Sequence, residues 1–328
     1  MLVRFYRESH PSSFFTLPLI ALLCWIPLLF FPPESFIVQV QNAMPLYEWL
    51  YTGISKLHIF AQYFISWLLV SIQAVYLNQL IVKHELFPKL TFLPALLFIT
   101  LSVLFPEMMR IQPALFVNLL LLMVLDKVFM LYKNPEPLGK VFDASFILSL
   151  ATLVDSSSIA FYFYLLLSFI ILLPFNWRVW IISFIGFALP LYFLNVYLFL
   201  TDSLNGFWQK IPAAFRFVHF MPPSLKPVQV IAVSVLLLIF LISVLSISSH
   251  FYRNIIRIRR YFQMLFLLVL FAVLSLLLTP AVSLRSLCMM IIPFSIFFSY
   301  FFLQVKRKTL AEISFFLLVM FIILVRLV

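Results

Sequence analysis

Glycine and charged residues are both scarce in this chain. Of 328 residues, only 4 are glycine and 10% are charged, whereas 65% are hydrophobic and 41 are phenylalanine. An ordinary soluble domain has about 25% charged and about 45–50% apolar residues. The composition therefore excludes a soluble fold, because no core could hide so much apolar surface. The scarcity of glycine predicts helices that pack through bulky side chains, with few close small-residue contacts and no GxxxG pairing.

Cysteine and histidine are too few and too scattered to suggest a metal or redox centre. Cys24 and Cys288 lie in apolar stretches without paired spacing, so we interpret them as small core residues. The 5 histidines form no i,i+4 pair, and no metal site is predicted. The net charge of +11 does not indicate a nucleic-acid partner, since the basic residues lie in short loops between apolar runs. The sequence names no cofactor.

Long apolar runs follow one another along the whole chain. A helix needs about 20 mainly apolar residues to span the hydrocarbon core of a bilayer. Runs of that order cover residues 14–33, 59–81, 90–106, 112–132, 142–155, 158–174, 178–200, 227–248, 261–279, 284–303 and 311–327. Because the runs are continuous rather than alternating, they predict helices and not barrel strands. We therefore expect one all-α domain over residues 1–328, a polytopic transmembrane helical bundle of about eleven spans.

Lysine and arginine are unevenly divided between alternate connections. The richer set holds fifteen of the 22, namely Arg4, Arg7, Lys83, Lys89, Lys127, Lys133, Lys140, Arg178, Arg253, Arg257, Arg259, Arg260, Lys306, Arg307 and Lys308. Positive residues are retained on the cytoplasmic side of a membrane. This bias predicts a cytoplasmic N-terminus and an extracytoplasmic C-terminus. The expected location is the inner membrane of a bacterium.

Two connections on the predicted outer side are long enough to hold structure. In residues 34–58, apolar side chains from Phe36 to Ile54 recur at helical spacing, which predicts one or two helices along the membrane surface. Residues 201–226 mix aromatic and basic residues, which is typical of an interfacial segment.

Charged residues at membrane depth usually face a cavity or a partner. Asp126 adjoins Lys127, and we interpret the two as an interfacial ion pair, with a proton relay as the alternative. Asp143 and Asp155 bracket about twelve apolar residues, which as a helix rise only ~18 Å against a core of ~30 Å. Asp155, followed by three serines, either caps the next helix or lines a water-filled cavity.

A short predicted outer loop carries both a carboxylate and a guanidinium. Glu107 and Arg110 are three residues apart and could pair on one helical turn. Alternatively, Arg110 could bind an anionic lipid head group, since arginine binds phosphate bidentately. Arg285, in another outer turn, either does the same or extends to the membrane interface.

In residues 104–115, LFPEMMRIQPAL, a proline ends one apolar run and an arginine precedes the next. This stretch is similar to the second outer loop of the C-type (GT-C) polyprenyl-phosphate-sugar glycosyltransferases, and roughly the first 200 residues resemble their membrane module. The resemblance implies an outward cavity for a polyprenyl-phosphate-linked sugar. It makes Glu34 the catalytic carboxylate, with Glu48 as a later candidate, and places Arg110 or Arg285 near the phosphate. The family commonly has an Asp-containing pair where this chain has the single Glu34.

Two other functions fit the same sequence. A non-enzymatic subunit or scaffold of an envelope assembly would contact other membrane proteins through its apolar faces, and the missing acidic pair favours it. A transporter would show two halves related by an internal repeat. No such symmetry is visible in the sequence.

Overall fold

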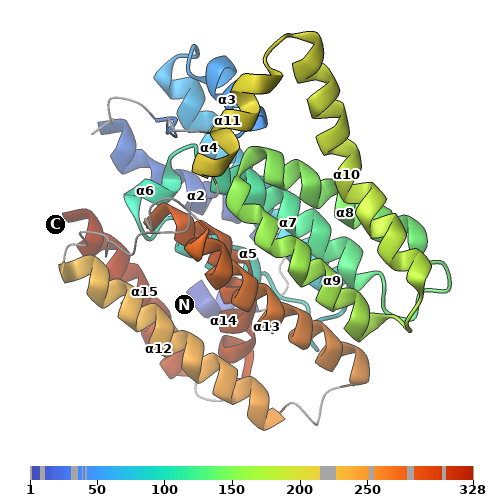
Figure 1. The fold of residues 1–328 in the computed structure, drawn as a ribbon. Helices are drawn as coiled ribbons and strands as arrows, with labels where there is room; N and C mark the ends of the chain where they lie inside the picture. The colour runs from blue at the N-terminus through green and yellow to red at the C-terminus, as the bar shows by residue number, and fades with distance from the viewer. Residues whose placement is uncertain are drawn as a thin grey trace.

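The computed structural model describes residues 2–7, 12–30, 36–38, 40, 43–214, 227–250, 255–278, 284–304 and 308–327. Within these ranges the chain is helical apart from turns, short loops and one isolated β-bridge (Figure 1). The all-α class predicted from the continuous apolar runs is therefore confirmed.

The helices coincide with the predicted apolar runs. In chain order they are α1 (Leu2–Arg7), α2 (Ser12–Phe30), α3 (Pro45–Ile54), α4 (Ile59–Lys83), α5 (Leu93–Ser102), α6 (Pro106–Met109), α7 (Pro113–Phe129), α8 (Leu138–Val154), the 3-10 helix η1 (Ser156–Ile159), α9 (Ala160–Leu172), α10 (Trp177–Leu200), α11 (Leu204–Ala214), α12 (Pro227–His250), α13 (Ile256–Leu277), the 3-10 helix η3 (Leu284–Met290), α14 (Ile291–Gln304) and α15 (Lys308–Leu327). Each of the eleven runs overlaps an α-helix, twice with a 3-10 turn before it.

Five helices are long and apolar enough to cross a membrane. They are α4, α10, Pro227–Ser248 of α12, α13 and Leu287–Gln304, which combines the end of η3 with α14. The 25 residues of α4 rise about 37 Å, which exceeds the ~30 Å hydrocarbon core. These helices indicate an integral membrane protein in a lipid bilayer.

Other apolar helices are shorter than a bilayer is thick. The extreme case is α5, whose ten residues rise only about 15 Å and are all buried inside the bundle. Other short apolar helices also face outward, since Phe15 of α2, Ile170 of α9 and Phe316 of α15 are 75%, 59% and 73% exposed. The number of complete crossings stays a prediction.

Helices adjacent in the chain are often not adjacent in space. Helix α8 packs against α7 and α10, while α9, which lies between α8 and α10 in sequence, packs against α13 (Figure 1). In the same way α14 packs against α5 and α12. The bundle is therefore held together by contacts between helices that are distant in sequence.

The contact between α8 and α10 depends on small residues. A Cβ atom added at Gly186 on α10 would lie 2.9 Å from the carbonyl oxygen of Phe142 on α8. One turn away, the hydroxyls of Ser145 and Ser183 are hydrogen-bonded at 2.9 Å. The scarcity of glycine predicts few such contacts, and Gly186 provides one, because a single glycine at the crossing is enough to bring two backbones together.

Most connections of the lysine- and arginine-rich set lie together at one end of the bundle, which we call the basic end. The contacts that join them are Arg7 Nη2 to the Leu303 carbonyl (2.7 Å), the Phe92 amide to the Tyr6 carbonyl (2.9 Å), Ser246 Oγ to Gln304 Oε1 (2.9 Å), Lys127 Nζ to Asp143 Oδ2 (2.7 Å) and Arg257 to Glu85. Lys306 and Arg307 are outside the described residues. These contacts join the N-terminal segment to the connections before α5 and α15, the end of α7 to α8, and the connection after α4 to the start of α13.

The predicted surface helices of residues 34–58 are only partly present. Helix α3 forms, but Phe36, Ile37 and Val38 are extended and buried, so the helical interpretation is wrong for them. Ile37 forms a parallel β-bridge with Ile111, which supplies hydrogen bonds that a helix would otherwise make within itself. In residues 201–226 the structure has α11, and residues 215–226 lie outside the described part.

Candidate functional site

The end of the bundle opposite the basic end is built from segments that are far apart in sequence. The Val38 amide donates to the Ile111 carbonyl at 2.8 Å, and the Ile111 amide donates to Phe36 at 3.1 Å. Tyr47 of α3 donates its hydroxyl to the Val38 carbonyl at 2.6 Å, and Ser66 of α4 donates to Met109 at 2.5 Å. These bonds fix residues 36–38 against the loop that carries Glu107 and Arg110.

The 3-10 helix η3 packs against α6 and α7 on the other side of the same loop. Two buried amides hold it at Cys288, since Gln112 Nε2 donates to the sulfur at 3.0 Å and Asn118 Nδ2 to the carbonyl at 2.8 Å. These two side-chain hydrogen bonds supply partners for the sulfur and the carbonyl oxygen of Cys288. In a regular α-helix the carbonyl would instead accept a bond from the backbone. The backbone of Arg285 is therefore near the loop of Arg110, while its side chain is outside the described part.

Glu107 is an unusual carboxylate for this setting. It lies in the first turn of α6, and its Oε2 atom is buried without a hydrogen-bond partner among the described residues. The ion pair expected between Glu107 and Arg110 is not found in the described contacts. The reason is that Arg110 lies past the end of α6 in extended backbone, at φ −72° and ψ 150°, and so does not share a helical turn with Glu107.

Arg110 lies near an aromatic pair. Its guanidinium is close enough to act electrostatically on the hydroxyl of Tyr63. The ring of Tyr63 packs on Phe36 with 4.1 Å between ring centroids. Phe36, Tyr63 and Arg110 are thus neighbours, although they belong to three separate segments.

The other predicted site residues are Glu34, Glu48 and Asp155. Glu34 is outside the described residues, two positions before Phe36. Glu48 is a half-buried residue in the first turn of α3, which packs against α8. Asp155 ends α8, and its Oδ1 accepts a hydrogen bond from the Ser157 amide at 3.2 Å. The capping interpretation of Asp155 is confirmed.

A narrow apolar crevice of about 50 Å³ lies beside this loop. Its walls come from the end of α5, from α6, α12 and the η3–α14 segment, and they include Leu104, Met108, Leu237, Leu287 and Phe294. Only 17% of the span-length part of α12 is buried in the bundle. The crevice therefore lies between the Glu107 loop and a helix that is largely exposed.

The basic end holds a second group of ionisable side chains. Asp126 accepts hydrogen bonds from Lys83 Nζ at 3.0 and 2.9 Å and contacts His84 Nε2 at 2.7 Å. The expected pair of Asp126 with Lys127 is wrong, because Lys127 reaches Asp143 on α8 instead. Sequence neighbours on a helix point in different directions.

Aromatic side chains enclose His84. Its ring meets those of Phe129 and Tyr261 edge-on, at 5.3 and 5.8 Å between centroids, and Tyr261 donates its hydroxyl to the Phe129 carbonyl at 3.1 Å. The group ties α4, α7 and α13 together. The group has a structural role, since its carboxylate has both its cationic and its imidazole partner within the protein.

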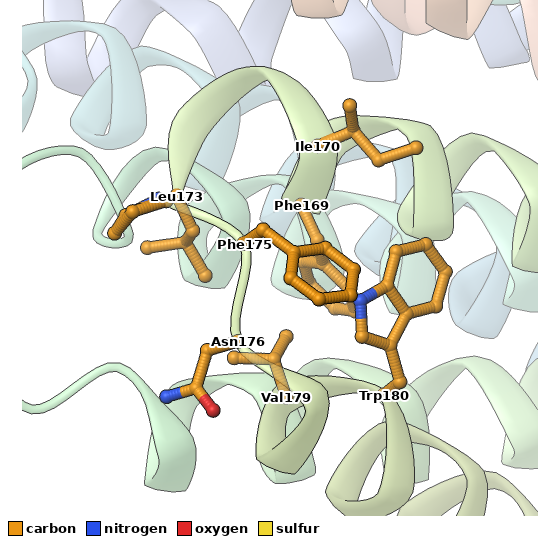
Figure 2. A pocket seen from close by; sticks show the side chains of 8 residues that line it. Phe169, Ile170, Leu173, Phe175, Asn176, Val179 and Trp180 are labelled. Carbon is orange, nitrogen blue, oxygen red and sulfur yellow. The ribbon is translucent and has the colours of Figure 1, made fainter.

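A third feature is an aromatic crevice at the turn between α9 and α10. Figure 2 shows the rings of Phe169, Phe175 and Trp180 gathered around it, with Asn176 at its edge. Its volume of about 60 Å³ would hold roughly two waters at ~30 Å³ each. Phe175 is 88% exposed, which is typical of the aromatic belt at a membrane interface rather than of a ligand site.

Among the described residues, no group of three or more His, Cys, Asp or Glu side chains could hold a metal ion. Comparisons with protein-family models, with curated proteins and with solved structures find no match to this chain. The function must therefore be argued from the site itself.

Proposed function

We propose that the chain crosses a bacterial inner membrane about eleven times, with the basic end in the cytoplasm and the C-terminus outside. The gathering of the lysine- and arginine-rich connections at one end supports this orientation. The loop of Glu107 and Arg110 then faces outward.

At that outer face, we propose a site for a polyprenyl-phosphate-linked sugar, used in a glycosyl transfer like that of the C-type (GT-C) enzymes. The observation that carries the proposal is the enclosed Oε2 atom of Glu107. A buried acceptor without a donor costs about 1–3 kcal/mol, so it calls for a ligand that supplies one. The hydroxyl of a sugar acceptor is such a donor.

The roles of the residues follow from their chemistry. Arg110 would hold the phosphate, and the apolar crevice would take the first isoprenoid carbons. Glu107 would accept the proton of the attacking hydroxyl, whose oxygen forms the new bond to the sugar carbon. The bond between the same sugar carbon and the phosphate oxygen breaks, and its electron pair leaves with the polyprenyl phosphate. Glu34 stays a candidate for the same role as Glu107.

Replacing Arg110 with glutamine should lower the amount of polyprenyl-phosphate lipid that copurifies with the protein by about tenfold. Hydrogen bonds to charged groups contribute about 1.5–3 kcal/mol net, which sets this scale. The measurement is mass spectrometry of lipids extracted from the purified protein. Glu136→Gln removes an exposed charge in the loop before α8 and should leave the lipid unchanged.

Glu107→Gln separates binding from transfer, because the amide keeps the shape but cannot take a proton. The lipid should be retained while transfer to an acceptor is lost.

If Arg110→Gln retains the lipid at the wild-type level, the proposed role of Arg110 in binding the phosphate is wrong. If no polyprenyl lipid copurifies with the wild type either, the non-enzymatic subunit becomes the better account, with the exposed apolar face of α12 as its contact surface.

A further inference from the structure

A groove of about 340 Å³ opens on the outside of the bundle at the basic end. Its apolar wall is formed by Phe14 and Leu17 of α2, by Val75 of α4 and by Phe92 just before α5. The volume is within the ~300–1,000 Å³ of small-molecule sites. Phe14 is 44% exposed, so the groove is open to the surroundings of the bundle rather than enclosed by it.

Asn78 gives the groove a polar group without a partner. The residue is only 5% exposed, its Oδ1 atom is buried, and its amide makes no hydrogen bond among the described residues. Gln73, one turn earlier on α4, is also buried, and its Oε1 atom likewise has no partner among the described residues, but its Nε2 atom donates to the Leu115 carbonyl at 2.8 Å. An amide next to apolar walls is costly unless something bonds to it. Asn78, which lines the groove and makes no side-chain hydrogen bond among the described residues, therefore points to a ligand there, whereas Gln73 is held by α7 and lies outside the groove.

Lys83 supplies positive charge at the polar side of the groove. A lysine ammonium has three donors, and Asp126 takes bonds from Lys83 at 3.0 and 2.9 Å. The side chain is 49% exposed, and one donor is left for a ligand. The exposed amide of Gln79 also lines this side. The polar side thus offers a cation and two amides.

We infer that this groove binds a phospholipid of the adjacent leaflet whose head group carries a hydrogen-bond donor. The phosphate lies at Lys83 and the side-chain amide of Gln79, and an O–H or N–H of the head group donates to the Asn78 side chain, which turns its amide to present the oxygen. The acyl chain follows the wall of Phe14, Leu17 and Val75. A lipid fits better than a soluble phosphate because the apolar wall runs along α4 beside the open face.

The head-group donor makes the inference testable with lipids that differ in that group alone. Phosphatidylglycerol and phosphatidylethanolamine have O–H or N–H donors, whereas phosphatidylcholine has the same phosphate and no donor. The full-length protein is equilibrated with mixed micelles that hold equal amounts of the three lipids, and the bound lipid is identified by native mass spectrometry. Bound phosphatidylglycerol and bound phosphatidylethanolamine should each exceed bound phosphatidylcholine by about fivefold. This is the scale of one net hydrogen bond.

Matched variants assign the preference to the groove. Asn78→Leu should abolish it, and Gln73→Leu, which removes a buried amide from the same helix outside the groove, should not. Gln79→Leu should weaken retention of all three lipids. Because this position is exposed, the variant should fold even if Asn78→Leu does not. Equal retention of phosphatidylcholine by the wild type would overturn the inference. So would displacement of the lipid by millimolar glycerol 3-phosphate, which would indicate a site for a soluble phosphate.

Discussion

Replacing Asp126 with leucine is expected to lower the free energy of unfolding by about 3 kcal/mol. Removing one partner of a buried charge pair costs about 3–5 kcal/mol, because the remaining charge is left without compensation. The side chains of Asp126 and His84 are only 10% and 8% exposed. Lys83 is half exposed and can regain water, which places the cost at the lower end of that range.

The measurement is the mole fraction of sodium dodecyl sulfate at which the purified protein unfolds in mixed micelles. Adding Lys83→Met to the Asp126 variant should recover part of the loss, since it removes the uncompensated ammonium. Glu136→Ala, at an exposed loop position, should change stability by less than about 0.5 kcal/mol. A leucine at position 126 that leaves the midpoint unchanged would mean that His84 and Lys83 find other partners.

The second large effect is expected at Gly186, where a leucine should cost about 3 kcal/mol. The added Cβ would lie 2.9 Å from the Phe142 carbonyl oxygen and 3.2 Å from Ser145 Cβ. Overpacking costs about 1–3 kcal/mol, and the upper end applies because the nearest atom belongs to the backbone of α8 and cannot rotate away. The two helices must move apart and give up the Ser145–Ser183 hydrogen bond.

Gly53 provides the matched control, since it is also a helical glycine and nothing lies within 4 Å of an added Cβ. Gly53→Ala should stabilise the protein slightly, by up to about 1 kcal/mol, because glycine is a poor helix former. Gly186→Ala should destabilise it. Thermal unfolding followed by gel filtration in detergent distinguishes the two signs. Equal behaviour of the two alanine variants would show that α8 and α10 do not meet at Gly186.

The helical elements could be predicted from hydropathy because long apolar segments have to satisfy their backbone groups internally in lipid. The exceptions have physical causes outside that pattern. Phe36 to Val38 are apolar at helical spacing, yet they are extended because Ile111 and Gln62 supply their hydrogen bonds. Those partners are in other segments, and one sequence does not reveal them.

Pairing of charges was the least predictable feature. Asp126 and Lys127 are neighbours in sequence and were expected to pair, but the partners of Asp126 are 42 and 43 residues away. For Asp155 the local signal was sufficient, since a cap joins residues two positions apart. The loop of Glu107 and Arg110 was identified in sequence, whereas its approach to Phe36 and η3 depends on how α4, α6 and α7 pack.

The measurement that tests the membrane arrangement most directly is labelling of single cysteines with a membrane-impermeant maleimide in sealed right-side-out vesicles. Cys24 and Cys288 are first replaced, and cysteine is then introduced at Lys56, before α4, or at Glu136, before α8; both positions are exposed. We expect Lys56→Cys to be labelled at once and Glu136→Cys only after the vesicles are opened. Labelling of both positions in sealed vesicles would contradict the two-ended arrangement and the outward site with it.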